Sequence, residues 1–136
     1  AGLLNGSIDA VIRVHTEDGS PRLFITDYKT NRLDSYEDVS LIEAYAPDRL
    51  VAAMEHHHYP LQALLYGTAI YRMLRWRQPA LNADEVIAGV AYFFVRGMVG
   101  VESPKDAHGM PYGVFQWKAP VGLWEKLSNL FAGDRP

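Results

Sequence analysis

The feature that most constrains the fold is a pair of segments rich in β-branched residues on either side of a short turn. The first runs from Ser7 to Val14 and the second from Arg22 to Lys29. The turn between them, residues 16–21, has Asp-Gly at its centre. Such runs joined by Asp-Gly are typical of a β-hairpin. We therefore expect strand, turn and strand over residues 4–30.

The length of the turn decides which side chains of this hairpin share a face. A three-residue loop, Glu17-Asp18-Gly19, fits a type I turn closed by a left-handed glycine, and it places Asp9 directly opposite Asp27. Lys29, two residues further on, shares that face. A two-residue loop, Asp18-Gly19, would instead turn Asp27 to the opposite face.

Two facing carboxylates predict a metal site, because like charges opposite each other destabilise a sheet unless a cation lies between them. Oxygen ligands suit magnesium, so Asp9, Asp27 and the backbone carbonyl of Tyr28 are candidate Mg²⁺ ligands. A metal there would acidify a bound water and neutralise charge on a phosphate, while a cationic Lys29 orients the water and stabilises the transition state. The alternative is a set of exposed strand-end charges, whose ion pairs are worth about 0–1 kcal/mol.

The rest of the chain predicts a small α/β domain in which helices cover the strands. Residues 88–95 form an apolar run that fits a central strand covered on both faces. Residues 31–47 are polar and rich in turn residues, which predicts a loop with a short helix. The other expected elements are helices over residues 47–55, 60–77 and 121–131 and an edge strand over residues 113–117.

The helix expected over residues 60–77 is apolar around most of its circumference, yet it has Gln62 and Tyr66 four residues apart on one face. An amide and a phenol in one row suggest the wall of a site that touches phosphate or the attacking water. The alternative is a buried glutamine and tyrosine with ordinary hydrogen-bond partners.

Several basic side chains are weaker candidates. Arg72 and Arg96 are candidate DNA contacts, although a helix end or a strand end explains each of them as well. His56, His57 and His58 resemble metal ligands, but three consecutive residues cannot all converge on one ion. A partly exposed segment at a helix end accounts for them.

Composition limits the remaining possibilities. A length of 136 residues suits one domain with a real core, and the net charge of −3 provides no global field that attracts nucleic acid. The absence of cysteine excludes disulfides and thiolate metal sites. No apolar run approaches the length of a membrane span, and we expect a cytoplasmic location without membrane contact. There is no initiator Met, and we expect a piece of a longer polypeptide.

Read together, several blocks of the sequence resemble one family. In chain order they are Gly6-Ser7-Ile8-Asp9, Asp27-Tyr28-Lys29-Thr30-Asn31, residues 59–66, residues 69–72, residues 89–97 and residues 130–133. Their order, with Gln-x-x-x-Tyr after Asp-Tyr-Lys-x-Asn, is similar to the C-terminal nuclease domain of the RecB subunit of bacterial RecBCD helicase-nucleases. The wider resemblance is to the PD-(D/E)XK nuclease superfamily.

The resemblance implies a restriction-endonuclease-like core, a small mixed sheet with an N-terminal antiparallel hairpin flanked by helices. It implies a Mg²⁺-dependent deoxyribonuclease of the exodeoxyribonuclease V type, in which Mn²⁺ can substitute, acting in double-strand break repair and recombination. Asp9 and Asp27 would bind metal, Lys29 would assist catalysis, and Gln62 with Tyr66 would complete the site. The implied partners are DNA, RecC-type and RecD-type subunits and a RecA-type recombinase.

One departure from the family bears on activity. The family has a helical segment upstream of the first strand with another metal ligand, and residues 1–136 correspond to the nuclease domain without that segment. We therefore expect weak Mg²⁺ binding and poor cleavage by this chain alone. The alternatives are a nuclease-like module that binds DNA or a partner subunit without cutting, and a stand-alone endonuclease of the same superfamily.

Overall fold

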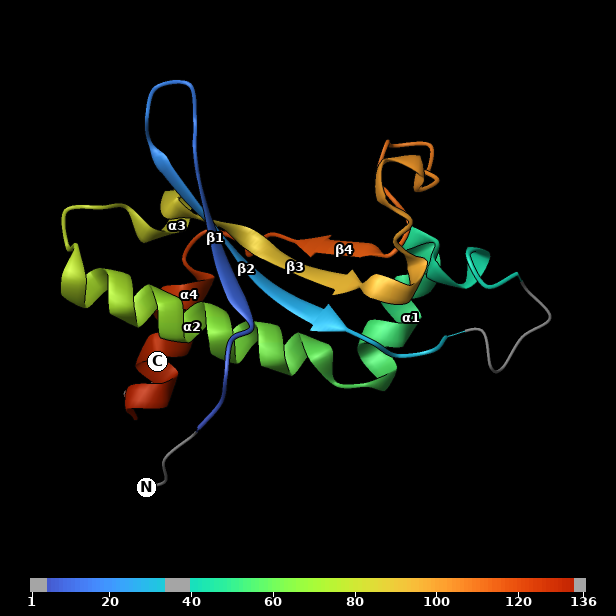
Figure 1. Ribbon diagram of the computed structural model, residues 1–136. Helices are drawn as coiled ribbons and strands as arrows, with labels where there is room; N and C mark the ends of the chain where they lie inside the picture. The colour runs from blue at the N-terminus through green and yellow to red at the C-terminus, as the bar shows by residue number, and fades with distance from the viewer. Residues whose placement is uncertain (1–4, 34–39, 134–136) are drawn as a thin grey trace.

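The structure, a computed structural model, describes residues 5–33 and 40–133 and is built on a four-stranded sheet in the order β1-β2-β3-β4 (Figure 1). The strands are β1 (Ala10–His15), β2 (Pro21–Lys29), β3 (Ile87–Phe94) and β4 (Val114–Trp117). β1 pairs antiparallel with β2, β2 pairs parallel with β3, and β3 pairs antiparallel with β4. The expected mixed sheet with an N-terminal hairpin is confirmed.

Of the two loop lengths that the sequence allows, the hairpin turn has the three-residue loop. The Thr16 amide donates to the Ser20 carbonyl at 3.0 Å, the Gly19 amide donates to the Thr16 carbonyl at 2.8 Å, and Gly19 has φ +80°. Hydrogen bonds from the Thr16 hydroxyl and the Ser20 amide to the Asp18 carboxylate lower the pKa of Asp18 to about 2. The carboxylate therefore keeps the turn closed throughout the neutral range.

The register follows from this turn. Ala10 faces Thr26, as the three-residue loop requires, so Asp9 lies level with Asp27. One detail of the prediction is wrong: the first strand begins at Ala10 rather than near residue 4, and Asp9 lies just before it. At Asp9 the side-chain carboxylate, rather than a backbone carbonyl, accepts the Tyr28 amide, so the backbone ladder stops there although β2 continues to Lys29.

The crossover from β2 to β3 contains the helices that cover the sheet. They are α1 (Pro47–His56), α2 (Tyr59–Arg77) and the short α3 (Ala83–Val86). A fourth helix, α4 (Leu123–Ala132), lies outside the crossover and follows β4. Single 3-10 turns lie at η2 (Glu43–Tyr45), η3 (Val95–Gly97) and η4 (Gly100–Glu102). The expected helices are confirmed with end shifts of one or two residues, and residues 34–39 of the expected loop lie outside the described part of the chain.

α1, α2 and α4 pack on one face of the sheet (Figure 1). The core there includes Ile25, Val90 and Trp124, all nearly inaccessible to solvent. The opposite face has Ile12 and Tyr28 substantially exposed. For the described residues this corrects the expectation that helices cover both faces. Ala91 on the open face is buried nevertheless, since it is small and lies between β2 and β4.

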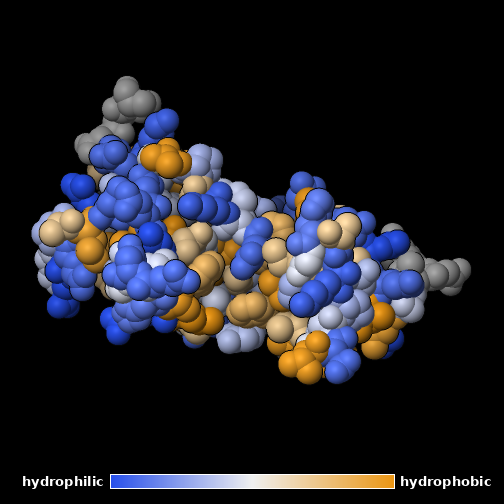
Figure 2. All heavy atoms as spheres, turned by 90° about the horizontal axis from the view of Figure 1, so that it is seen from above, coloured by the Kyte–Doolittle hydropathy of each residue, from blue (hydrophilic) through white to orange (hydrophobic). Residues whose placement is uncertain are grey.

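Figure 2 shows hydrophilic and hydrophobic residues interspersed on the face seen from above. None of the described helices combines the length with the apolar character that crossing a membrane requires.

α2 and α4 approach closely because Gly67 leaves room for an indole. A Cβ on Gly67 would lie 2.1 Å from the ring of Trp124, whose side chain is fully buried and stands edge-on to Trp117. The closest approach of these two helices therefore depends on the absence of one methyl group.

We predict that Gly67→Ala lowers the free energy of unfolding by about 1–3 kcal/mol, the usual cost of overpacking, although alanine is the better helix former by about 1 kcal/mol. Urea unfolding monitored by circular dichroism measures the change. In a Trp124→Leu background the same substitution should cost less, because the ring it strikes is gone. Equal or greater stability of Gly67→Ala in the native background would contradict this packing argument.

Candidate active site

The predicted site residues lie together where the end of β2 passes over the N-terminal half of α2 (Figure 1). β2 supplies Asp27 and Lys29, whose side chains share a face because they are two residues apart. α2 supplies Gln62 and Tyr66 from adjacent turns. Each pairing in this cluster can be followed through individual contacts.

Asp27 is a buried carboxylate with one cationic partner. Its residue is only 4% exposed, and its Oδ2 forms an ion pair with Lys29 Nζ. Among the described residues this oxygen receives no hydrogen bond of regular geometry. A buried charge needs compensation, so the ammonium group of Lys29 is what makes the position of Asp27 tolerable.

Lys29 is held in turn by α2. Its Nζ donates to Gln62 Oε1 at 3.0 Å, and Gln62 Nε2 donates to Tyr66 Oη at 3.1 Å. The amide is thereby oriented by both neighbours, with oxygen toward the cation and nitrogen toward the phenol. Because Tyr66 Oη accepts this bond, its own proton remains available to a further acceptor.

Two tyrosines that the sequence analysis did not assign to the site enclose the ammonium group. Lys29 Nζ lies 4.1 Å from the ring centroid of Tyr59 and 5.2 Å from that of Tyr92. The Tyr92 hydroxyl reaches the Tyr59 carbonyl at 3.0 Å and Gln62 Oε1 at 3.3 Å. Tyr92 lies level with Asp27 in the parallel pairing of β2 and β3, a register that sequence periodicity does not reveal.

Asp9 approaches the site from the neighbouring chain segment. It is exposed, and its Oδ2 accepts a hydrogen bond from the Tyr28 amide at 2.9 Å. The amide and carbonyl of one strand residue point toward the same neighbour, so the Tyr28 carbonyl also faces the Asp9 side. Asp9, Asp27 and this carbonyl thus provide oxygen donors around one strand end.

This donor set suits a hard cation. Within the described part of the chain no cluster of three or more His, Cys, Asp or Glu side chains could hold a metal ion. The donors at this strand end are two carboxylates and one backbone carbonyl, so they do not form a cluster of that kind. They are nevertheless oxygen ligands that Mg²⁺ accepts, with water completing its coordination shell. Among the residues that the structure describes, the ammonium group of Lys29 alone compensates the buried Asp27 Oδ2, and this oxygen is the atom that most favours a cation.

The other candidates are distributed more widely. Arg96 lies at the site edge, where its Nε donates to the Thr30 carbonyl at 2.7 Å. Arg72 is two turns further along α2 than Tyr66 and does not join the cluster. The exposed His56 and His57 end α1, and His58 adopts φ +56° before α2, as expected for a helix-end segment.

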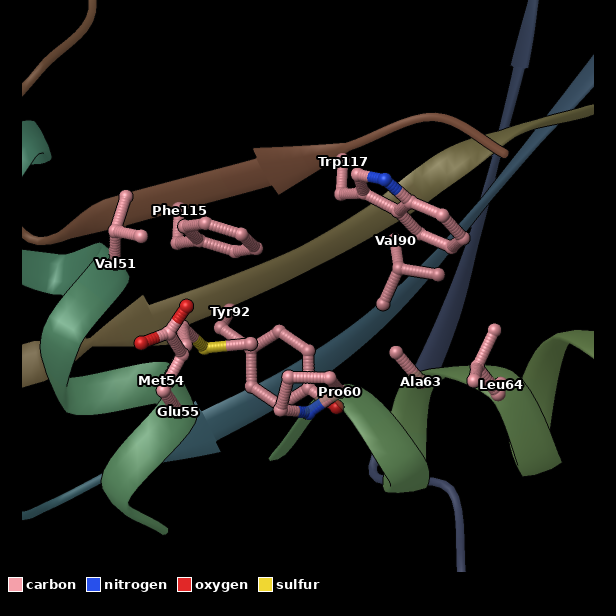
Figure 3. A pocket seen from close by; sticks show the side chains of 10 residues that line it. All are labelled: Val51, Met54, Glu55, Pro60, Ala63, Leu64, Val90, Tyr92, Phe115 and Trp117. Carbon is pink, nitrogen blue, oxygen red and sulfur yellow. The ribbon is translucent and has the colours of Figure 1, made fainter. Parts of the chain in front are cut away.

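An apolar cavity of about 290 Å³ lies behind the site, and Figure 3 shows its lining. Val51 and Met54 of α1, Ala63 of α2 and Phe115 of β4 surround it. Tyr92 forms its boundary with the site: the ring borders the cavity, and the hydroxyl points into the polar network.

Tyr92 gives the site a measurable alkaline signature. Burial, followed by the charge of Asp27, raises the pKa of Tyr92 well above its ordinary value near 10. The folded state therefore holds this proton more tightly than the unfolded chain, so the stabilisation is complete below pH 10 and declines as the pH rises further.

We predict that wild-type protein loses stability above pH 10 more steeply than Tyr92→Phe, as measured by urea unfolding between pH 8 and pH 11. At neutral pH the substitution should cost about 1 kcal/mol for the lost hydrogen bonds. Tyr28→Phe, which removes an exposed phenol from the same sheet, is the matched control and should retain the wild-type profile. Parallel profiles for wild type and Tyr92→Phe would show that the hydroxyl is not held as described.

Comparison with known proteins shows which sequences the chain is similar to. It is 42% identical over 135 residues to the RecBCD enzyme subunit RecB of Mycolicibacterium smegmatis and 45% identical over 135 residues to that of Mycobacterium tuberculosis. It is 36% identical over 132 residues to the RecBCD enzyme subunit RecB of Escherichia coli. No protein-family model matches the sequence.

The three alignments cover 99%, 98% and 97% of this chain but only 12%, 11% and 10% of the respective relatives. The chain thus spans about a tenth of the length of the curated relatives that it matches. The chain is therefore homologous to one segment of the RecB subunit of the RecBCD enzyme.

Proposed function

We propose that this chain is the magnesium-dependent nuclease domain of a RecB-type helicase-nuclease and hydrolyses phosphodiester bonds of DNA. The observation that supports this most is the convergence of Asp27, Lys29, Gln62 and Tyr66 at one strand end, with Asp9 beside them. In this proposal the segment corresponds to the C-terminal part of RecB, and the sheet with its helices is a restriction-endonuclease-like core of the PD-(D/E)XK superfamily.

Asp9, Asp27 and the Tyr28 carbonyl would hold the metal. The residues fit because each is an oxygen donor and because Asp27 Oδ2 is buried with only an ammonium group to balance it. Bound Mg²⁺ supplies an acidified water and a positive charge beside the phosphate, and Mn²⁺ can replace it. The Asp9 carboxylate is oriented in advance by the Tyr28 amide.

Lys29 would serve as a fixed positive charge. Its neighbours are a carboxylate, an amide oxygen and two aromatic faces, all of which attract a positive charge. A cation held in a half-buried site stabilises negative charge that develops on phosphate in the transition state, because the site needs little reorganisation. Its protons can also orient the attacking water.

Gln62 and Tyr66 would position the substrate. Gln62 keeps Lys29 directed toward Asp27 through its Oε1 and directs Tyr66 through its Nε2. The free hydroxyl proton of Tyr66 can donate to a phosphate oxygen. Arg96, anchored on Thr30 beside the site, is placed to contact a neighbouring phosphate.

The homology supports a setting within a larger enzyme. We propose that the domain acts in DNA repair and recombination in the cytoplasm, with RecC-type and RecD-type subunits and a RecA-type recombinase as partners. The net charge of −3 fits this arrangement, because a motor that feeds the strand in removes the need for a strongly basic nuclease surface.

The test of this function combines metal binding with cleavage. We expect calorimetry to show weak, saturable Mg²⁺ binding that both Asp9→Asn and Asp27→Asn abolish. Cleavage of a labelled oligonucleotide should be slow in the wild-type chain and about 10²–10³-fold slower in Asp27→Asn, the scale of losing one electrostatic contributor to a transition state.

Glu17→Gln is the matched control, because it removes an exposed carboxylate from the same hairpin and should change neither measurement. Metal-independent cleavage, or cleavage that Asp27→Asn leaves intact, would contradict the proposal. DNA binding without any Mg²⁺-dependent cleavage would instead support a module that binds without cutting.

A further inference from the structure

The site row of α2 continues along the helix as an exposed stripe. The stripe consists of five residues at alternating spacings of four and three, which places them on one helical face. They are Gln62, Tyr66, Ala69, Met73 and Trp76. Ala69, Met73 and Trp76 are all exposed. From Tyr66 to Trp76 the axial distance is about 15 Å at 1.5 Å per residue.

Trp76 at the end of this stripe is unusually accessible. Its side chain is 75% exposed, more than any other aromatic among the large exposed hydrophobic residues of the described chain. The guanidinium carbon of Arg77 lies 4.3 Å from the ring centroid and covers one face. The other face is available for stacking, and the adjacent cation strengthens contact with an electron-rich or anionic group.

Trp76 also borders a polar cleft of about 380 Å³ between α2 and α4. Arg72 and Arg75 line it from α2, and Glu125 and Asn129 line it from α4. Within the described part of the chain neither Arg72 nor Arg75 forms an ion pair. The cleft therefore offers two uncommitted guanidinium groups next to an open aromatic ring.

We propose that this end of α2 binds single-stranded DNA, with a base stacked on Trp76 and phosphates at Arg72 and Arg75. Stacking on exposed aromatic rings with phosphate contacts alongside is how proteins bind single strands without reading sequence. The proposal rests on the proposed function, because the stripe would lead the strand toward Asp27 and Lys29. At a stacked rise of 3.4 Å, 15 Å corresponds to about four nucleotides.

The simpler explanation accounts for only part of the arrangement. Arginines in the last turns of a helix interact favourably with the helix dipole, which would explain their positions. It does not explain why a tryptophan remains 75% exposed in the same turn. Glu125 opposes an anion in the cleft, but the two arginines that line it, Arg72 and Arg75, outweigh its single charge.

The decisive experiment measures the affinity for a fluorescent 20-nucleotide oligothymidylate by anisotropy in EDTA, which prevents metal-dependent cleavage. Trp76→Ala should raise Kd about 5- to 150-fold, the equivalent of one stacked base, while Trp76→Phe should stay close to wild type. Binding should also quench the emission of Trp76, since the other two tryptophans are buried or half-buried. Unchanged Kd in Trp76→Ala would overturn the proposal and leave the exposed ring to a protein partner.

The arginines are tested by salt dependence. Each phosphate contact contributes about 0.7 to the slope of log K against log salt for a single strand, so Arg72→Ala and Arg75→Ala should each lower it by about that amount. Lys105→Ala removes the same charge from an exposed loop residue outside the cleft and should leave the slope unchanged. An equal effect of Lys105→Ala would show that only non-specific charge matters and would overturn the proposed site.

The two proposals fail separately. Cleavage that depends on Asp27, together with an unchanged Kd in Trp76→Ala, would contradict only the strand-binding site. Loss of DNA affinity in Trp76→Ala, without Mg²⁺-dependent cleavage by any variant, would contradict only the nuclease assignment.

Discussion

The buried charge of Asp27 is the constraint on which the arrangement of the site depends. A carboxylate that is 4% exposed must be balanced nearby, and Lys29 provides that balance from the same face of the same strand. An ammonium group in such a place needs acceptors of its own, which Gln62 and the rings of Tyr59 and Tyr92 supply. Tyr66 is then fixed through Gln62. Each side chain of the network thus compensates for the burial of the one before it, so the network is expected to respond to substitution as a unit rather than residue by residue.

The backbone places these side chains through two registers that meet on β2. The hairpin turn sets the first, since a loop of three residues brings Asp9 level with Asp27 and a loop of two would not. The parallel pairing with β3 sets the second and brings Tyr92 level with Asp27. The crossover through α1 and α2 closes that parallel pair and also lays Gln62 and Tyr66 against the face that both registers share. The turn at Gly19 therefore determines which residues face each other at the site, although it lies far from Asp27 along the strand.

What the sequence could predict follows from local chemistry. Helical spacing sufficed to place Gln62 and Tyr66 on one face. The Asp-Gly turn allowed loops of two and of three residues, and the observed register decides that Asp9 lies level with Asp27. The roles of Tyr59 and Tyr92 could not be inferred, because they depend on a parallel register set by a crossover of more than fifty residues. Residues 87–94 are apolar almost throughout, which hides the alternation between a helix-covered face and an open one. The start of the first strand was misplaced because β propensity does not show that the side chain of Asp9, rather than its backbone, receives the Tyr28 amide.

The same ion pair that stabilises Asp27 also bears on how a metal could be used. Asp27 Oδ2 is now committed to Lys29, so a cation that binds this carboxylate must share or take over that oxygen. Two positive charges around one buried carboxylate repel each other, which weakens metal affinity relative to a site without the lysine. The same repulsion would turn the Lys29 ammonium from Asp27 toward the anion that arrives with the substrate, while the contacts of its Nζ with Gln62 and the Tyr59 ring keep it within the site. If the proposed function holds, one arrangement predicts both weak binding of the metal to the free domain and tighter binding with DNA present, because the phosphate would supply the negative charge that the two cations lack.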